Sequence, residues 1–150
     1  MAARPTHSAR STKPAALYGS RRMSIQRTTI ATTVQAMQRA FTAEELHRAV
    51  TAEAPGIGLA TVYRAIGAMQ SAGSLVSVGE RDGSALLALC ARHDHHHHLV
   101  CTECGAVVAI DCPIDDATVR AAARSGHLVT DHQIILYGIC ADCRTQTEGS

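Results

Sequence analysis

The chain has 150 residues, of which 46% are hydrophobic, but it contains one Phe and no Trp. A core so poor in aromatic side chains favours one ordinary domain, or two small ones that gain stability from a metal ion or a partner subunit. The sequence contains no apolar run of about 18 residues, so we expect a soluble protein without a membrane span.

Charge is divided unevenly along the chain, although the net charge is only +1. Residues 1–78 carry nine Lys or Arg against three Glu, a net charge of +6, whereas residues 79–150 carry five Arg against ten acids, a net charge of −5. This division predicts that the first half meets a polyanion and the second half meets cations. A chance skew, helped by a basic tail, is the alternative.

The first 23 residues are rich in Arg, Ser and Ala and contain no acid, which is also the composition of an organelle transit peptide. They lack the apolar core of a secretory signal, and we expect a disordered basic tail over residues 1–23. Six cysteines without a secretory signal indicate reduced thiols, which bind metal or do redox work more often than they form structural disulfides. We therefore expect a cytoplasmic protein.

Three helices are predicted after the tail. Apolar side chains at helical spacing indicate helices over residues 25–40 and 59–72. Between them, Thr42-Ala-Glu-Glu45 is a capping box that begins a helix, and Pro55-Gly56 ends it.

Two short strands over residues 75–78 and 85–89 follow the helices, joined by a turn at residues 80–83. Three helices and then a hairpin is the order of a winged helix-turn-helix domain, which we place at residues 24–90. The third helix would present Ala60, Thr61, Tyr63 and Arg64, the small and donor side chains that a helix needs to read a DNA groove. Any amphipathic helix shows a mixed polar face, so this prediction depends on the flanking elements.

The second half predicts a small α/β unit, which we place at residues 91–150. Strands are indicated over residues 99–101, 107–110 and 132–139, and a helix over residues 115–125. The predicted fold class is therefore α+β.

Two matched CxxC motifs lie within this unit, Cys101 with Cys104 and Cys140 with Cys143. Each motif closes a tight turn that brings two thiolates together, and four thiolates in tetrahedral geometry form a closed structural zinc site. A redox dithiol, the alternative, would need one such motif beside a βαβ pattern rather than two.

Four consecutive histidines, His95 to His98, precede the first of these motifs. Because successive side chains of a strand point to opposite faces, one pair shares each face, and the strand can serve two metal ions. Cys90 is the natural thiolate to join His96 and His98, and a thiolate favours a borderline ion such as Zn²⁺.

On the other face, His95 and His97 lack local partners. We expect Asp116, or its neighbour Asp115, together with His132 to complete a second sensory site. Cys112 and His7 are interpreted as structural or incidental.

Other interpretations of the histidine run are weaker. A purification tag would lie at a terminus, whereas this run is internal and leads into a CxxC motif. A zinc hydrolase would need a general base at helical spacing beside the histidines, as HExxH supplies, and none is present. We expect no enzyme activity and no small organic substrate.

The chain resembles the ferric uptake regulator superfamily of metal-sensing repressors over roughly residues 24–144. The resemblance rests on three ordered motifs, Gly58-Leu-Ala-Thr-Val-Tyr-Arg64, His95-His-His-His-Leu-Val-Cys-Thr-Glu-Cys-Gly105 and Leu136-Tyr-Gly-Ile-Cys-Ala-Asp-Cys143. It implies a homodimer whose winged helices bind a palindromic operator when the C-terminal dimerisation domains hold metal. Tyr63 would contact bases, Arg64 phosphate or base edges, and Arg27 the DNA backbone.

A thiolate at position 90 with four histidines is most similar to the zinc uptake branch, so the resemblance implies structural and regulatory Zn²⁺. Relatives in that branch take a fourth ligand from an Asp in the first wing strand, where this chain has Val76 and Ser77. Asp82, Glu80, His93 or His47 would have to substitute. An iron or peroxide sensor, and a zinc-buffering metallochaperone without DNA binding, are the alternatives.

Overall fold

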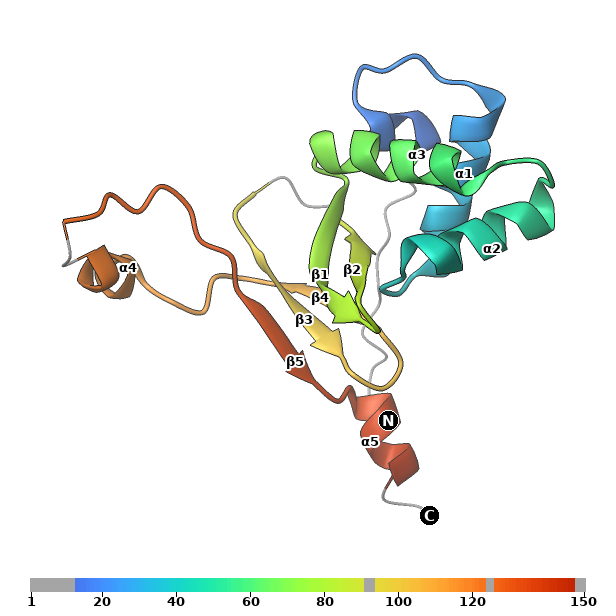
Figure 1. Cartoon of the computed structure of the whole chain (residues 1–150). Coiled ribbons are helices and arrows are strands. Elements are labelled where there is room, and N and C mark those ends of the chain that lie inside the picture. The colour runs from blue at the N-terminus through green and yellow to red at the C-terminus, as the bar shows by residue number, and fades with distance from the viewer. Residues whose placement is uncertain (1–12, 91–93, 124–125, 148–150) are drawn as a thin grey trace.

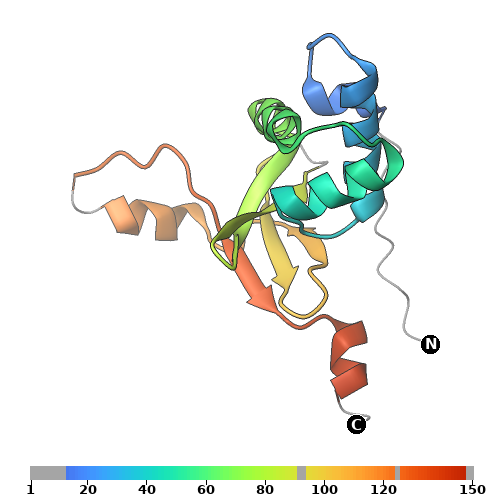
Figure 2. The same cartoon turned by 45° about the vertical axis from the view of Figure 1, so that its right-hand side comes forward.

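A computed structural model of the chain describes residues 13–90, 94–123 and 126–147. Helices come first and are followed by a two-stranded hairpin, and a three-stranded sheet with two short helices makes up the rest (Figure 1). A second view shows α4 projecting to one side of the sheet and α5 at its far end (Figure 2). The elements in chain order are η1 (Pro14–Tyr18), α1 (Ile25–Met37), α2 (Ala43–Glu53), α3 (Leu59–Ser71), β1 (Leu75–Arg81), β2 (Ser84–Leu89), β3 (His97–Cys101), β4 (Val107–Ile110), α4 (Asp116–Ala122), β5 (Ile135–Gly138) and α5 (Ala141–Thr147).

The helical part is held together by one core with well-capped helices around it. The predicted capping box is present: Glu45 N–H donates to Thr42 Oγ1 at 3.2 Å and Thr42 N–H donates to Glu45 Oε2 at 2.9 Å. These bonds satisfy amides at the start of α2 that have no partner within the helix. The core takes apolar side chains from every helix of this part: Leu17, Ile30, Val34, Phe41, Leu46, Val50, Val62, Ile66 and Met69.

The predicted disordered tail, residues 1–23, differs from the structure in its second half. Residues 1–12 lie outside the described residues, but Pro14–Tyr18 form a turn of 3-10 helix with Pro14 at its start. Leu17 and Tyr18 are 3% and 1% exposed and join the helical core. The sequence does not predict this helical turn, because two apolar side chains beside a basic stretch show no periodicity.

The hairpin β1–β2 is antiparallel and forms the wing. Its register shifts between Ser77 and Gly79, a bulge that allows Gly79 to adopt a φ of 136°. Phe41 pairs with Leu87 through two backbone hydrogen bonds of 2.8 and 2.9 Å, so the segment before α2 extends the wing sheet.

The second sheet has the order β4-β3-β5. β3 pairs antiparallel with β4, so His97 faces Ile110, and it pairs parallel with β5, so His98 faces Ile135. The parallel pairing needs a long crossover, which α4 and the segment after it provide. The predicted helix over residues 115–125 is shorter than expected, and α5 was not predicted.

A second, smaller cluster joins the wing to the second sheet. Ala40, Val78, Leu86, Ala88 and Val100 are all buried in it. Within the described parts of the chain, no helix is both long and apolar enough to cross a bilayer.

Candidate metal centres and nucleic-acid interface

α3 presents the predicted groove-reading side chains outward. Ala60, Tyr63 and Arg64 are exposed and Thr61 is half-buried, while Val62 on the opposite side is fully buried in the core. Arg64 donates to Thr61 Oγ1 at 3.0 Å, which holds the guanidinium along the helix surface.

Basic side chains from α1, from the segment before it and from α3 meet in one groove. Arg22, Arg27, Thr61 and Arg64 line it. Arg27 donates to the backbone oxygen of Arg22, and its guanidinium carbon lies 5.7 Å from the centre of the Tyr18 ring. Three guanidinium groups in one groove favour a polyanion such as a phosphate backbone. The structure thus brings Arg27 close to residues of the predicted reading helix.

Tyr63 has a partner that sequence reasoning missed. Its hydroxyl donates to Glu44 Oε1 of α2 at 2.9 Å, and this hydrogen bond raises the pKa of Tyr63. Hydrogen bonds from its own backbone amide first, and then from Tyr63, lower the pKa of Glu44. No local pattern joins residues 19 apart on two helices, so only packing reveals this pair.

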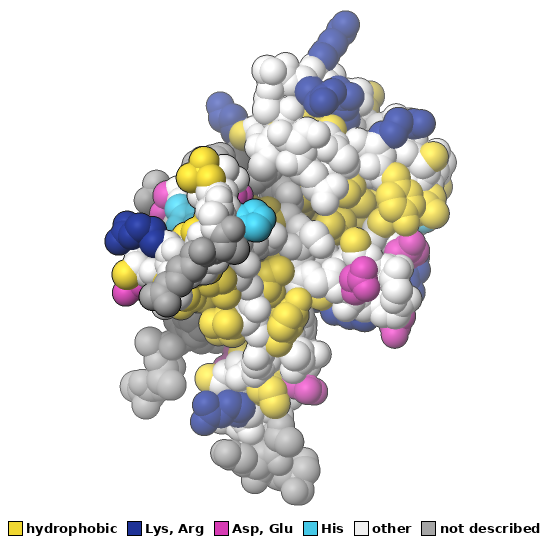
Figure 3. All heavy atoms as spheres, turned by 60° about the vertical axis from the view of Figure 1, so that its left-hand side comes forward, with side chains coloured by type: hydrophobic (Ala, Val, Ile, Leu, Met, Phe, Trp, Pro, Cys, Tyr) yellow, Lys and Arg dark blue, Asp and Glu magenta, His cyan; other side chains and the backbone are white. Residues whose placement is uncertain are grey.

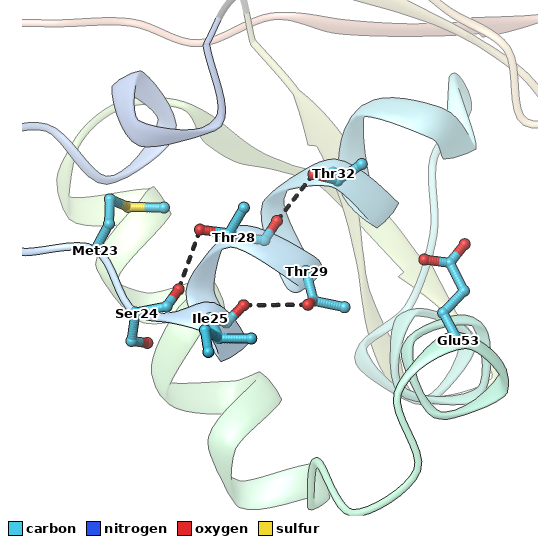
Figure 4. A pocket seen from close by; sticks show the side chains of 7 residues that line it. All are labelled: Met23, Ser24, Ile25, Thr28, Thr29, Thr32 and Glu53. Atoms are coloured by element: carbon cyan, nitrogen blue, oxygen red, sulfur yellow. Dashed lines mark hydrogen bonds between the residues drawn. The ribbon is translucent and has the colours of Figure 1, made fainter.

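A second depression near α1 has a different character (Figure 4). Its lining is Met23, Ser24, Ile25, Thr28, Thr29, Thr32 and Glu53. The threonine hydroxyls donate to backbone oxygens four residues earlier, as between Thr32 and Thr28 at 3.0 Å. The lining contains a carboxylate and no cation, so this surface does not suit DNA phosphates.

The four knuckle cysteines converge at the end of the second sheet. Cys101 ends β3, Cys104 lies in the turn to β4, and Cys140 and Cys143 follow β5. Two sulfurs bound to one tetrahedral zinc ion at ~2.3 Å stand about 3.8 Å apart. Cys104 Sγ lies 3.8 Å from Cys140 Sγ, so the donor geometry fits such an ion.

Thiol ionisation in this group is uneven. Burial raises the pKa of Cys101, but backbone amides, those of Cys104 and Cys140 first, outweigh it and bring the pKa down to about 6. Hydrogen bonding to Cys140, followed by burial, raises the pKa of Cys143 to about 12. One thiolate therefore forms readily, and neighbouring sulfurs oppose further ionisation unless a cation is bound.

A second group joins the wing to the second sheet. Cys90 directly follows β2, His96 lies just before β3 and His98 lies within β3, and one donor atom of each is within 4.8 Å of the others. Cys90 Sγ lies 3.2 Å from His96 Nε2, near the roughly 3.5 Å expected for sulfur and nitrogen on one tetrahedral zinc ion.

The rings of this group are prepared for a metal. His96 Nδ1 donates to Asp94 O at 2.6 Å, a hydrogen bond that selects the tautomer with Nε2 as the metal-binding nitrogen, and Nε2 lies 3.2 Å from Cys90 Sγ. Burial, followed by the charges of His96 and His97, lowers the pKa of His98, so its neutral, metal-binding form is favoured.

None of the expected substitutes for a fourth ligand joins this group within the described part of the chain. His47 Nε2 lies 3.0 Å from Ile57 O, and Asp82 occupies the hairpin tip with a φ of 52°. Glu80 is exposed on β1, and His93 lies outside the described residues.

A third group lies on the opposite face of β3, as the strand alternation predicts. His95 and His97 meet His132, which precedes β5. Cys112, which follows β4, is the fourth member, which corrects its interpretation as structural or incidental. Ring centres of His95 and His97 lie 4.7 Å apart, and those of His97 and His132 lie 4.9 Å apart.

The structure does not bring Asp116 into this group. Asp116 is the first residue of α4 and is exposed. Asp115 caps the same helix: its Oδ1 accepts from Thr118 N–H at 2.7 Å, and this hydrogen bond lowers its pKa. Neither carboxylate therefore joins the histidines as expected, because α4, which begins at Asp116, projects away from the sheet (Figure 2).

The sequence of the chain is similar to those of known metal-dependent regulators. The sequence model described as the ferric uptake regulator family matches residues 19–137. The ferric uptake regulation protein of Bordetella parapertussis is 39% identical over 107 residues, which is 71% of this chain and 76% of that protein. The zinc uptake regulation protein of Mycobacterium tuberculosis is 33% identical over 121 residues, which is 80% of this chain and 92% of that protein.

Among solved structures, a zinc uptake regulator complexed with zinc and DNA superposes with a TM-score of 0.65 at 25% identity, covering 86% of this chain and 87% of that one. The predicted α+β fold, a winged helix followed by a small dimerisation domain, is confirmed. Proteins of this family are metal-responsive transcription regulators that bind operator DNA as dimers, and they are not enzymes. With more than half of its length matched by the family model, the chain belongs to the ferric uptake regulator family.

Proposed function

We propose that this chain is a repressor that binds its operator as a dimer when it is loaded with Zn²⁺. One observation carries the proposal: the sulfur of Cys90, at the end of the wing, meets the imidazoles of His96 and His98 at the start of the second sheet. A metal ion held by these three groups would cross the boundary between the DNA-reading part and the rest. We place that boundary between residues 90 and 91, with Pro14–Tyr18 added to the winged-helix domain.

Zinc is favoured by the donor set. Thiolate and imidazole together suit Zn²⁺, whereas Fe²⁺ and Mn²⁺ favour sites with oxygen ligands. The described residues place no carboxylate in the group of Cys90, His96 and His98. Relatives named for iron and for zinc both resemble the chain above 30% identity, so the donors, rather than the names, support zinc.

Two further metal sites belong to the proposal. Cys101, Cys104, Cys140 and Cys143 hold a structural zinc ion that closes the far end of the second sheet. His95, His97 and His132 form part of a second sensory site at the opposite end of that sheet, where β3 and β5 begin. Reduced thiols are required for both zinc–thiolate sites, which fits a cytoplasmic location.

We propose that metal binding shifts the population of the dimer towards the conformation that binds DNA. Metal across Cys90, His96 and His98 fixes the angle between wing and second sheet, and thereby the spacing of the two α3 helices in a dimer. To move a two-state equilibrium from 1:99 to 99:1, the ion must bind the competent state more tightly by about 5.5 kcal/mol. Tyr63 and Arg64 read bases, and Arg27 contacts the phosphate backbone.

An apolar face of the second sheet is the proposed dimer surface. Leu99, Val108 and Leu136 are neighbours across the three strands and are 38%, 40% and 43% exposed. In Figure 3, several Lys and Arg side chains lie at the helical end of the molecule, and apolar side chains gather below it. A second copy would cover this face and leave both α3 helices free for DNA.

The test is DNA binding under buffered metal. Duplexes are selected from a random-sequence pool with the full chain in buffered Zn²⁺, and the selected duplex is titrated by fluorescence anisotropy in Zn²⁺, Fe²⁺, Mn²⁺ and Ni²⁺. We expect affinity to rise most steeply with Zn²⁺ and to fall with salt, because Arg side chains displace counterions from the phosphates. Cys90→Ser should lose the zinc response but keep one zinc ion per chain in the knuckles.

Other outcomes identify the alternatives. A response to Fe²⁺ alone, with a histidine oxidised after peroxide, would indicate an iron or peroxide sensor. Zinc binding without any selected duplex would indicate a zinc buffer. An unchanged zinc response in Cys90→Ser would contradict the proposed switch.

A further inference from the structure

Cys112 stands where three elements of the second sheet begin or end. It follows β4, His132 precedes β5, and His95 lies just before β3. Because β3 is antiparallel to β4 and parallel to β5, these three points meet at one end of the sheet. The knuckle cysteines occupy the opposite end.

The donor atoms are spaced for a single ion. His95 Nε2 lies 3.2 Å from His132 Nε2, and Cys112 Sγ lies 3.2 Å from the same His132 nitrogen. Two nitrogens bound to tetrahedral zinc at ~2.0–2.1 Å stand about 3.3–3.4 Å apart, and a nitrogen and a sulfur about 3.5 Å. These separations match one shared ion between three donors.

His97 is the fourth and least prepared member. Its Nε2 is buried and has no hydrogen-bond partner among the described residues, while Ile134 N–H donates to its Nδ1 at 3.0 Å. In the neutral ring the proton therefore sits on Nε2. His97 enters the coordination sphere only when that proton leaves or when the Ile134 amide gives up its bond.

We propose that Cys112, and not a carboxylate of α4, is the protein ligand that completes the metal site of His95 and His132. On binding, the thiol proton passes to solvent and the sulfur bonds to the ion. This inference rests on the proposed function for the existence of a second metal site, and it specifies its chemistry. A thiolate with imidazoles selects zinc and similar late divalent metals over iron and manganese.

The choice of ligand also decides which elements of the fold the ion connects. An ion bound by Cys112 and His132 ties the end of β4 to the start of β5, on either side of β3. α4 is left outside the site, which agrees with its lack of any buried residue. A carboxylate ligand at Asp116 would instead dock α4 against the sheet.

Cobalt is the probe, because a thiolate bound to Co²⁺ gives a charge-transfer absorption in the near ultraviolet and oxygen or nitrogen ligands do not. The chain has six cysteines, of which four form the knuckles. In Cys90→Ser protein with zinc retained in the knuckles, the remaining thiol is that of Cys112. Titration of this variant with Co²⁺ should therefore give the absorption at one ion per chain, with zinc retention checked by elemental analysis.

Two double variants supply the comparison. Cys90→Ser with Cys112→Ser should lose the absorption and bind Co²⁺ more weakly by about 10-fold or more. Cys90→Ser with Asp116→Asn, the matched control for the carboxylate, should keep both the absorption and the affinity.

The proposal is overturned if the Cys90→Ser protein shows no charge-transfer absorption with Co²⁺. This test does not depend on whether a Cys112 variant folds. The proposal is also overturned if Asp116→Asn removes the bound cobalt while Cys112→Ser retains it. None of these readings involves DNA. Failure of zinc-dependent operator binding therefore leaves the cobalt result standing, and the reverse also holds.

Discussion

Tyr18 shows how far one residue can depart from its sequence context. It lies beside the basic stretch of the N-terminus, yet it is 1% exposed and its hydroxyl has no hydrogen-bond partner in the described part of the chain. Burial raises the pKa of Tyr18 to about 12, although the charge of Arg27 opposes the shift. The ring stabilises the helical core, while the unpaired hydroxyl costs free energy.

Replacement of this hydroxyl should therefore be harmless at neutral pH. We expect Tyr18→Phe to leave the free energy of unfolding unchanged or raise it by up to about 1 kcal/mol. The folded-state pKa lies above the unfolded value near 10, so the wild-type contribution is complete below pH 10 and is lost as the pH rises towards 12. Urea denaturation at pH 8, 9.5 and 11 measures it, and the variant's advantage should grow at pH 11. Parallel pH profiles would refute the assignment.

At the scale of elements, we expect the stability of the second sheet to depend on metal ligands at its ends. Its strands have four or five residues each, and Val100, Val107 and Ile135 pack in the cluster that joins it to the wing. A sheet this small buries little apolar surface, so ligand bonds must contribute to its folding. The proposed zinc ion of the knuckles would supply them where β3 and β5 end, and α5 follows directly from the first cysteine of the second knuckle.

Removal of the knuckle zinc should unfold this sheet before the helices. A strong chelator in a reducing buffer is expected to abolish the hydrogen-exchange protection of β3, β5 and α5, while α1 and α3 keep theirs because their core contains no metal ligand. Cys90→Ser protein serves as the control, since its knuckles are intact and it should lose protection in the same way. Retained protection of β3 after complete zinc removal would contradict this dependence.

At the scale of the whole molecule, the wing is packed directly against the second sheet, in addition to the proposed metal site between them. Tyr137 of β5 donates to Val78 O at 2.8 Å, and Ala40 N–H donates to Gly105 O at 2.8 Å. Gly79 makes the first contact possible, because a Cβ there would lie 2.5 Å from the Tyr137 hydroxyl. Any change of angle during switching has to alter these contacts.

Gly79 should therefore be coupled to Tyr137 across the two parts. Gly79→Ala combines a φ of 136° with this clash, and we expect it to reduce the free energy of unfolding by about 1–3 kcal/mol. In a Tyr137→Phe background the loss should be smaller, because the clashing oxygen is gone. Gly83→Ala is the matched control, since its φ of 78° brings strain but its Cβ would meet nothing within 4 Å. Equal losses for Gly79→Ala in both backgrounds, measured by urea denaturation, would show that no coupling exists.

The sequence by itself determined the features whose cause is local. Helix periodicity, the Thr42 capping box, the two CxxC turns and the alternation of His95 to His98 between two faces all depend on residues a few positions apart. For the same reason the family motifs could be recognised. The expected meeting of Cys90 with His96 and His98 needs a span of only eight residues, and the structure brings them together.

Only the tertiary structure decided which distant groups meet. The pairing of β3 with β5 brings His132 to His95 across 37 residues, and the turn after β4 brings Cys112 there in place of Asp116. The same packing buries Tyr18 and pairs Tyr63 with Glu44. Such contacts follow from strand register and from the burial of apolar faces over the whole chain, and no short stretch of sequence encodes either.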